Sequence, residues 1–257
     1  KYDDGSTYCF SCQVSTQDSD VEQFFEASPG FVEVPAASFV IPTDVRGFRD
    51  RGIKTAISEF FDVTVKLQDG EISHHYYPYF KDGSIVGAKV RTVKSKQFMA
   101  IGDKKGAELF GMSKFNPGGR KVVITEGELD TMAVAQAFMD KYNKVFPVVS
   151  LPDGAQSAKK ACLQHRDWLR SFDEVILMFD MDEPGIEATQ IASKIIGADK
   201  VKLAVLTAKD PCDAYLQGGS AVILNAVWNA QPWQPAGIIN AADTWPEYLL
   251  EKDAIYQ

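Results

Sequence analysis

Two stretches decide the fold: Lys121-Val-Val-Ile-Thr-Glu126-Gly-Glu-Leu-Asp130 and Val175-Ile-Leu-Met-Phe-Asp180-Met-Asp182-Glu-Pro-Gly185. Each is an apolar run that stops abruptly in carboxylates and a glycine, as buried strands bounded by turns do. If both strands belong to one parallel sheet, they deliver their acids to the same edge. Carboxylates gathered there repel one another unless a cation neutralises them. The pattern therefore predicts a hard divalent metal, and with it chemistry on phosphates.

Strands and helices alternate on both sides of these stretches. We expect strands at 121–125, 146–151, 174–180 and 201–206, and helices at about 128–140, 156–171 and 184–196, the last capped by Gly197. A further helix is expected over Val222–Trp228. This rhythm predicts an α/β fold, with a mostly parallel sheet flanked by crossover helices.

The chain before residue 119 has a different texture. Spacing of apolar residues predicts a helix over 44–62, and residues 63–98 are typical of antiparallel strands with turns at Asp69-Gly70 and Asp82-Gly83. We therefore expect a smaller mixed α+β subdomain at 31–118, a linker at 13–30, the parallel-sheet domain at 119–230, and a connector at 231–257.

Composition and charge restrict the class of protein. The chain has 257 residues, 45% of them hydrophobic, and it contains no apolar run long enough to cross a bilayer and no signal peptide, so we expect a cytoplasmic protein. It begins without a methionine, which suggests a fragment. Net charge is −8, yet residues 81–121 hold ten Lys or Arg against three Asp or Glu. That segment therefore carries +7 and the rest −15, a distribution that favours binding of a polyanion.

Three acids are the candidate catalytic residues. Asp180 and Asp182 are alternate residues at a strand end, so both can face one side, and Glu126 ends a second strand. Together they are predicted to hold Mg²⁺ (or Mn²⁺), with Glu126 acting either as a ligand or as the base for a sugar hydroxyl. After the next strand, Asp210 is a candidate outer metal ligand and Lys209 a candidate phosphate contact.

The basic segment supplies candidate contacts to nucleotide or template. Lys89 and Arg91 alternate on a predicted strand, so both cations are expected to face one way, toward phosphates. Further candidates are Lys94, Lys96, Lys104 and Lys105. A purely solvated surface fits each single lysine equally well.

The four cysteines divide into two kinds. Cys162, in a helical pattern, and Cys212, in a predicted short loop, are expected to be free thiols. Cys9 and Cys12 have the spacing of a zinc knuckle, but a structural zinc site needs four ligands and only two are here. Residues 1–12 are therefore predicted to be the C-terminal half of a zinc ribbon, or else an incidental pair.

The motifs together resemble the Toprim catalytic module. More narrowly, the chain is similar to the primase half of the bifunctional primase–helicases of podophage-type bacteriophages, with mitochondrial Twinkle as a distant relative. The pieces that carry this resemblance include Gly87-Ala-Lys89-Val-Arg91, Glu108-Leu-Phe-Gly111, Thr125-Glu126-Gly127-Glu128, Phe179-Asp180-Met-Asp182 and Val227-Trp-Asn-Ala230. Their order along most of the chain is more specific than the Toprim motifs alone.

This resemblance implies a DNA primase, a nucleotidyltransferase that makes short RNA primers from ribonucleoside triphosphates on single-stranded DNA during phage replication. It implies Mg²⁺ at Glu126, Asp180 and Asp182, Zn²⁺ in a ribbon whose first cysteine pair is missing here, and a replicative helicase and a polymerase as partners. Ser6 stands where some relatives have a histidine. The alternatives are a Toprim nuclease or topoisomerase fragment, and a non-catalytic module that binds single-stranded DNA for a helicase.

Overall fold

The computed structural model describes residues 7–9, 14–16 and 39–234, and the chain divides into two compact units, 1–38 and 39–257. In the first unit, β1 (Thr7–Cys9) pairs with β2 (Val14–Thr16) in antiparallel fashion. β2 falls in the segment for which the sequence predicted a linker. Of the predicted zinc half-site, Cys9 ends β1 and Cys12 lies outside the described residues.

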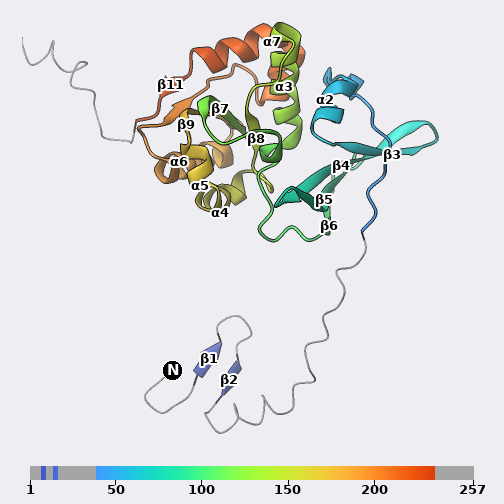
Figure 1. Ribbon diagram of the computed structural model, residues 1–257, viewed down its shortest axis with the longest axis horizontal. Coiled ribbons are helices and arrows are strands. Elements are labelled where there is room, and N and C mark those ends of the chain that lie inside the picture. The colour runs from blue at the N-terminus through green and yellow to red at the C-terminus, as the bar shows by residue number, and fades with distance from the viewer. Residues whose placement is uncertain (1–6, 10–13, 17–38, 235–257) are drawn as a thin grey trace, which may run out of the picture. The chain divides into compact units, whose positions relative to one another are not determined.

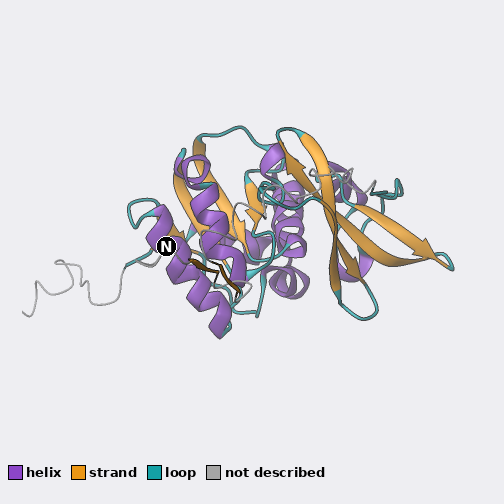
Figure 2. Ribbon diagram, turned by 90° about the horizontal axis from the view of Figure 1, so that it is seen from below, coloured by secondary structure: helices purple, strands orange, loops and turns teal. Residues whose placement is uncertain are grey.

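The second unit begins with a four-stranded antiparallel sheet in the order β3-β4-β5-β6. Its strands are β3 (Thr64–Gln68), β4 (Glu71–Lys81), β5 (Ser84–Thr92) and β6 (Phe98–Gly102). The turns Asp69-Gly70 and Asp82-Gly83 have positive φ at all four residues, as two-residue type I′ hairpin turns require. The predicted antiparallel strands and both turns are confirmed (Figure 2).

The helix predicted over 44–62 is much shorter than expected. Only η1 (Arg49–Arg51) and α2 (Thr55–Phe60) are helical. Phe48 and Ile53 instead form an antiparallel bridge around a tight turn, and Gly52 closes η1 with a φ of +65°. The apolar spacing that predicted a long helix reflects burial of this turn, where Phe48, Ile53 and Ile57 are all in the core.

The second sheet has five strands in the order β11-β10-β9-β7-β8. Four run parallel, and only the edge strand β11 (Gln231–Pro232) runs antiparallel. The parallel strands are β7 (Gly119–Thr125), β8 (Val148–Ser150), β9 (Phe172–Met178) and β10 (Val201–Leu203). This confirms the mostly parallel sheet, and each strand lies within two residues of its predicted start.

Helices cover both faces of this sheet (Figure 1). Val123, Ile176 and Met178 face a core shared with α3 (Glu128–Tyr142) and α7 (Pro211–Trp228). The alternate residues of the same strands, among them Val122 and Val175, face a second core. That core is closed by η3 (Ala155–Ser157), α4 (Ala158–Gln164), α5 (Arg166–Arg170) and α6 (Glu183–Ile196), and η2 (Met112–Lys114) precedes β7.

Two helix predictions need correction. The helix expected over 156–171 is interrupted, since α4 ends at Gln164 and α5 begins at Arg166. The helix expected from Val222 begins at Pro211, with a kink at Gly219, so Cys212 lies in a helix and not in a loop. Cys162 and Cys212 are buried free thiols, as predicted. Among the described residues, no helix is long and apolar enough to cross a membrane.

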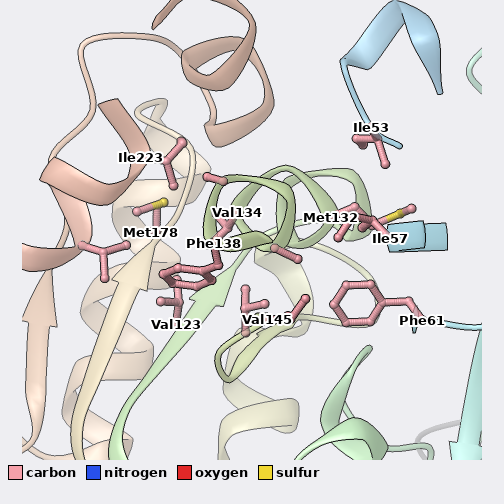
Figure 3. Close-up of a cluster of buried hydrophobic side chains, with 14 of the residues drawn as sticks. Ile53, Ile57, Phe61, Val123, Met132, Val134, Phe138, Val145, Met178 and Ile223 are labelled. Carbon is pink, nitrogen blue, oxygen red and sulfur yellow. The ribbon is translucent and has the colours of Figure 1, made fainter. Parts of the chain in front are cut away.

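Helix α3 joins the two sheets in one core. Its residues from Thr131 to Phe138 are all buried. In Figure 3, Phe138 and Val134 lie toward Val123, while Met132 lies toward Ile57 on the side of α2. Because α3 is held on several sides, its first turn has a fixed position at the carboxyl end of β7.

Candidate active site

The carboxyl ends of β7 and β9 meet at one edge of the parallel sheet. The two strands are paired directly, with Thr125 opposite Met178. Glu126 follows the first strand and Asp180 follows the second, and both line one open pocket of about 420 Å³. The lining holds five carboxylates but a single lysine, Lys89. Of the three acids expected to converge, Glu126 and Asp180 share this pocket, whereas Asp182 is exposed and does not line it.

Glu126 is held by the loop that follows β8. Its Oε1 accepts a hydrogen bond from the backbone N–H of Ala155 at 3.2 Å. Gly154 has a φ of +68°, and a Cβ at that position would lie 3.4 Å from Oε1. The other oxygen, Oε2, is buried and has no hydrogen-bond partner among the described residues. The loop thus orients the carboxylate and leaves one oxygen available.

Asp180 is also left with an unsatisfied oxygen. Its Oδ1 is buried and finds no hydrogen-bond partner in the described part of the chain. Burial raises the pKa of Asp180 to about 7, and the nearby charges of Glu126, Asp210 and Asp182 act in the same direction. Gly185 is required beside it, because a Cβ there would lie 2.2 Å from the Asp180 carbonyl oxygen.

Asp182 and Asp210 both cap helices. Asp182 Oδ1 accepts from the Gly185 N–H at 3.1 Å, at the start of α6, and Asp210 Oδ1 accepts from the Asp213 N–H at 2.7 Å, at the start of α7. The Met181 N–H donates to the Lys209 carbonyl at 3.0 Å and so ties the two loops together. The exposed Lys209 lies close enough for its charge to lower the pKa of Asp180 in part.

Two further acids, which were not among the candidate ligands, lie in the same pocket. Glu128 and Asp130 occupy the first turn of α3 and line the pocket with Glu126. Asp130 Oδ1 accepts from the Cys212 N–H at 3.1 Å. Burial, then the charges of Asp210 and Asp180, hold the pKa of Asp130 well above its usual range. A search restricted to strand ends misses these acids, although the Glu-x-Glu-x-Asp spacing after β7 is visible in the sequence.

The residues present suit a hard cation. No three His, Cys, Asp or Glu side chains among residues 7–9, 14–16 and 39–234 are grouped tightly enough to hold a metal by themselves. However, Glu126 and Asp180 each present a buried carboxylate oxygen without a partner in this described part. Mg²⁺ commonly takes one or two carboxylates and fills its remaining positions with water and phosphate oxygens. Two such oxygens therefore meet its needs.

The predicted basic strand is only partly directed at the pocket. Lys89 and Arg91 lie on one face of β5, opposite Tyr77 and His75 of β4. The Lys89 ammonium is bonded to Glu128 Oε1 and Oε2 at 3.0 and 3.1 Å and to the Pro152 carbonyl at 3.2 Å. Arg91 is only 8% exposed and does not line the pocket. Lys89 and Arg91 alternate along β5 as predicted, but both side chains are largely buried and are not presented to solvent as free cations.

The remaining lysines lie farther out. Lys94 and Lys96 are exposed in the turn between β5 and β6. Lys104 pairs with Asp153 at 3.2 Å, and it lines, with Lys105, a second pocket next to the first. Asp153 lines both pockets. None of these four lysines lines the acidic pocket, and Lys104 and Lys105 line the pocket that shares Asp153 with it.

Known proteins match the parallel-sheet domain and, over longer stretches, most of the chain. Residues 123–215 match the family described as Toprim-like. The DNA helicase/primase of enterobacteria phage T3 is 40% identical over 178 residues, which is 68% of this chain and 30% of that protein. The crystal structure of the primase fragment of bacteriophage T7 primase-helicase superposes with a TM-score of 0.67 at 33% identity, covering 89% of this chain and 92% of that fragment.

The chain belongs to the bacteriophage DNA helicase/primase family. It spans 30% of the length of the T3 helicase/primase. A further T7 structure contains lagging-strand DNA polymerase interacting with primase domains bound to an RNA/DNA hybrid and dTTP. It shares 38% identity with this chain and a TM-score of 0.65, covering 74% of this chain and 93% of that one.

The Toprim-like match includes all four candidate metal ligands, the two that line the acidic pocket and the two that cap α6 and α7. Glu126, Asp180, Asp182 and Asp210 all fall within residues 123–215, whereas Lys89 and the other basic candidates of β5 and β6 precede them. The acidic edge thus belongs to the module that the family shares with other Toprim proteins. Lys89 belongs to the antiparallel sheet that precedes this module in the chain, whereas Lys209 falls inside the match.

Proposed function

We propose that this chain is a DNA primase core, which joins ribonucleotides into short RNA primers on a single-stranded DNA template during phage replication. One observation carries the proposal. Glu126 and Asp180, at the carboxyl ends of adjacent parallel strands, each offer a buried oxygen without a partner among the described residues, in a chain of the helicase/primase family.

In this proposal Glu126 and Asp180 bind Mg²⁺ or Mn²⁺ through those oxygens. Asp182 and Asp210 add negative charge beside Asp180, and each has one oxygen engaged in a helix cap. A bound metal supplies neutralisation of the charge that develops on the transferring phosphoryl group. Glu126 alternatively accepts the proton of the attacking sugar hydroxyl, since Oε2 is available for either role.

The basic residues around the pocket bind the polyanions. We assign contacts to nucleotide phosphates or to the template strand to Arg91, Lys94, Lys96, Lys104, Lys105 and Lys209. The five lysines are exposed, whereas Arg91 is only 8% exposed and stays a prediction from the strand alternation. Lys89 differs from them because its ammonium is already bonded within the protein.

The relatives suggest the larger assembly. We propose that residues 1–12 complete a zinc ribbon when the other cysteine pair is present, and that residues 13–30 are a linker. Residues 31–118 and 119–230 then form the basic and catalytic parts, and 231–257 connect to a helicase. A replicative polymerase is a further partner, as in the T7 structure with lagging-strand polymerase. The place of action is the cytoplasm of the bacterial host.

A primer-synthesis assay tests the proposal. Labelled ribonucleoside triphosphates are incubated with the protein and single-stranded DNA of random sequence, with and without Mg²⁺. Short RNA products that require metal and template are expected. Cleavage of DNA without nucleotides would favour a Toprim nuclease or topoisomerase fragment. DNA binding that survives metal removal, with no synthesis under any condition, would favour a non-catalytic module.

A further inference from the structure

Lys89 connects the two sheets at the edge of the acidic pocket. It extends from β5 and bonds both oxygens of Glu128, in the first turn of α3, and the carbonyl oxygen of Pro152, after β8. The side chains of Lys89 and Glu128 are 12% and 6% exposed. The contact therefore joins three elements in an environment from which water is largely excluded.

The ammonium has no bonding capacity left in this arrangement. A lysine has three N–H donors, and Lys89 has three oxygen acceptors within 3.2 Å. On a fourth side, its Nζ lies 4.8 Å from the centroid of the Phe98 ring. A nucleotide phosphate would therefore have to displace Glu128 or Pro152 in order to bind Lys89 directly.

The loop that Lys89 holds at Pro152 also holds the candidate metal ligand Glu126. Pro152 begins the short loop that continues through Gly154 to Ala155, and the Ala155 N–H holds Glu126 Oε1. The same loop packs Gly154 against the Glu126 carboxylate. Movement of the loop would thus release the hydrogen bond from the Ala155 N–H that orients Glu126.

We propose that Lys89 is a positioning residue, which together with Glu128 ties the antiparallel sheet to the loop Pro152–Ala155 and so fixes the Glu126 carboxylate with Oε2 directed at the cation. This inference rests on the proposed function, because it assigns Lys89 a role in the same site. It replaces the sequence-based expectation that Lys89 binds nucleotide phosphates.

A double substitution removes the contact between Lys89 and Glu128 without changing the net charge of the pocket. Lys89→Met with Glu128→Leu removes one positive and one negative charge, so the net charge of the pocket stays constant. Replacing a buried ion pair by apolar residues of similar volume is often neutral for stability. The Pro152 carbonyl nevertheless loses its donor, and the loop loses its attachment to β5.

The measurements are Mn²⁺ affinity by electron paramagnetic resonance, primer-synthesis kinetics and the thermal midpoint. We expect an unchanged midpoint, Mn²⁺ affinity weakened on the order of 10-fold, and a similar loss in kcat, as for partners that orient metal ligands elsewhere. KM for ribonucleotides should stay within about 2-fold, since a tether that only positions Glu126 adds no binding to the substrate. The matched control is Lys54→Met with Asp140→Leu, which removes an ion pair at the far end of α3 and should change neither constant.

A rise in KM with unchanged Mn²⁺ affinity would overturn the inference and identify Lys89 as a phosphate ligand. Equal losses in the control would overturn it too. The single variant Glu128→Gln separates the two roles further: freed from its partner, a phosphate-binding Lys89 would lower KM, whereas a tether predicts slower synthesis. If wild-type protein makes no primers, the proposed function fails, while Mn²⁺ affinity still tests the tether.

Discussion

The acidic edge of the parallel sheet and the basic face of the antiparallel sheet bring opposite charges to one pocket in different ways. At the acidic edge, the strand ends themselves carry Glu126 and Asp180, and each retains a buried oxygen without a partner among the described residues. On the basic side, Lys89 is bonded to Glu128, and Lys104 is paired with Asp153. Acids are left unsatisfied, while the nearest bases are neutralised.

This difference shows what topology alone can fix. Parallel strands must place their carboxyl ends together, so an acid that follows such a strand has a position set by the sheet. A lysine has a long, flexible side chain, so the position of its ammonium group depends on the carboxylate with which it pairs and not on the strand alone. The net +7 of residues 81–121 therefore measures a regional field and not the position of a phosphate site.

The largest expected effect lies at the acidic edge. Asp180→Asn should lower primer synthesis on the order of 1,000-fold, because metal stabilisation of a phosphoryl transition state is worth several kcal/mol. Asp173→Asn, an exposed change near the start of the same strand, is the control and should leave the rate unchanged. Primer yields followed over time decide the matter. Wild-type yield from Asp180→Asn would contradict the metal assignment.

On the basic face, buried His75 makes stability depend on pH. Burial, and then the charge of Arg91, lower its pKa to about 4. The unfolded chain, with an ordinary histidine pKa near 6.5, therefore binds more protons between pH 6.5 and 4, and stability is lost as pH falls through that window. The loss is at most about 3 kcal/mol. Urea unfolding of wild type and His75→Gln across this range should show a shallower slope for the variant; equal slopes would mean that His75 titrates normally.

Gly154 tests whether the loop after β8 positions Glu126. Gly154→Ala puts a Cβ 3.4 Å from Glu126 Oε1 at a φ of +68°, which should destabilise the fold by about 1–2 kcal/mol and slow synthesis about 10-fold. Gly70→Ala is the matched control, since Gly70 has a φ of +83° in open space. It should lose stability without losing rate. If Gly154→Ala and Gly70→Ala made primers at equal rates, the loop after β8 would not be what positions Glu126.

The smallest effect is expected for the exposed lysines of the basic sheet. Lys94→Ala with Lys96→Ala should weaken single-stranded DNA binding several-fold and reduce the salt slope of log K by about 1.4, at roughly 0.7 for each phosphate that the variant no longer neutralises. The control, Lys141→Ala with Lys194→Ala, removes the same charge from exposed positions on α3 and α6. Fluorescence anisotropy at several salt concentrations measures both. Identical salt slopes for this variant and the control would show that DNA binding depends on the overall charge of the protein and not on contacts by Lys94 and Lys96.

The sequence predicted the acidic edge because its signals are local. An apolar run that ends in carboxylates marks a strand and its end, and Gly185 marks a close approach of the following helix. Convergence of Glu126 and Asp180 then follows from the sheet. The turns at Asp69-Gly70 and Asp82-Gly83 were predictable for the same reason, because the residue types match the backbone that a hairpin needs.

What the sequence did not predict depends on partners far along the chain. The bonds of Lys89 to Glu128 and Pro152 join residues 39 and 63 positions apart. The shortened helix at 44–62 follows from a bridge between Phe48 and Ile53 and from burial against other elements. The start of α7 was predictable and missed: Asp210 followed by Pro211 is a common helix start.

Mn²⁺ binding, followed by electron paramagnetic resonance on wild type, Glu126→Gln and Asp180→Asn, tests the central assignment most directly. It needs neither nucleotide nor template, so it separates the cation site from all later steps. Each variant should bind Mn²⁺ on the order of 10-fold more weakly or worse, because each removes one of the two unpartnered carboxylates. Wild-type affinity in both variants would place the cation elsewhere and contradict the account.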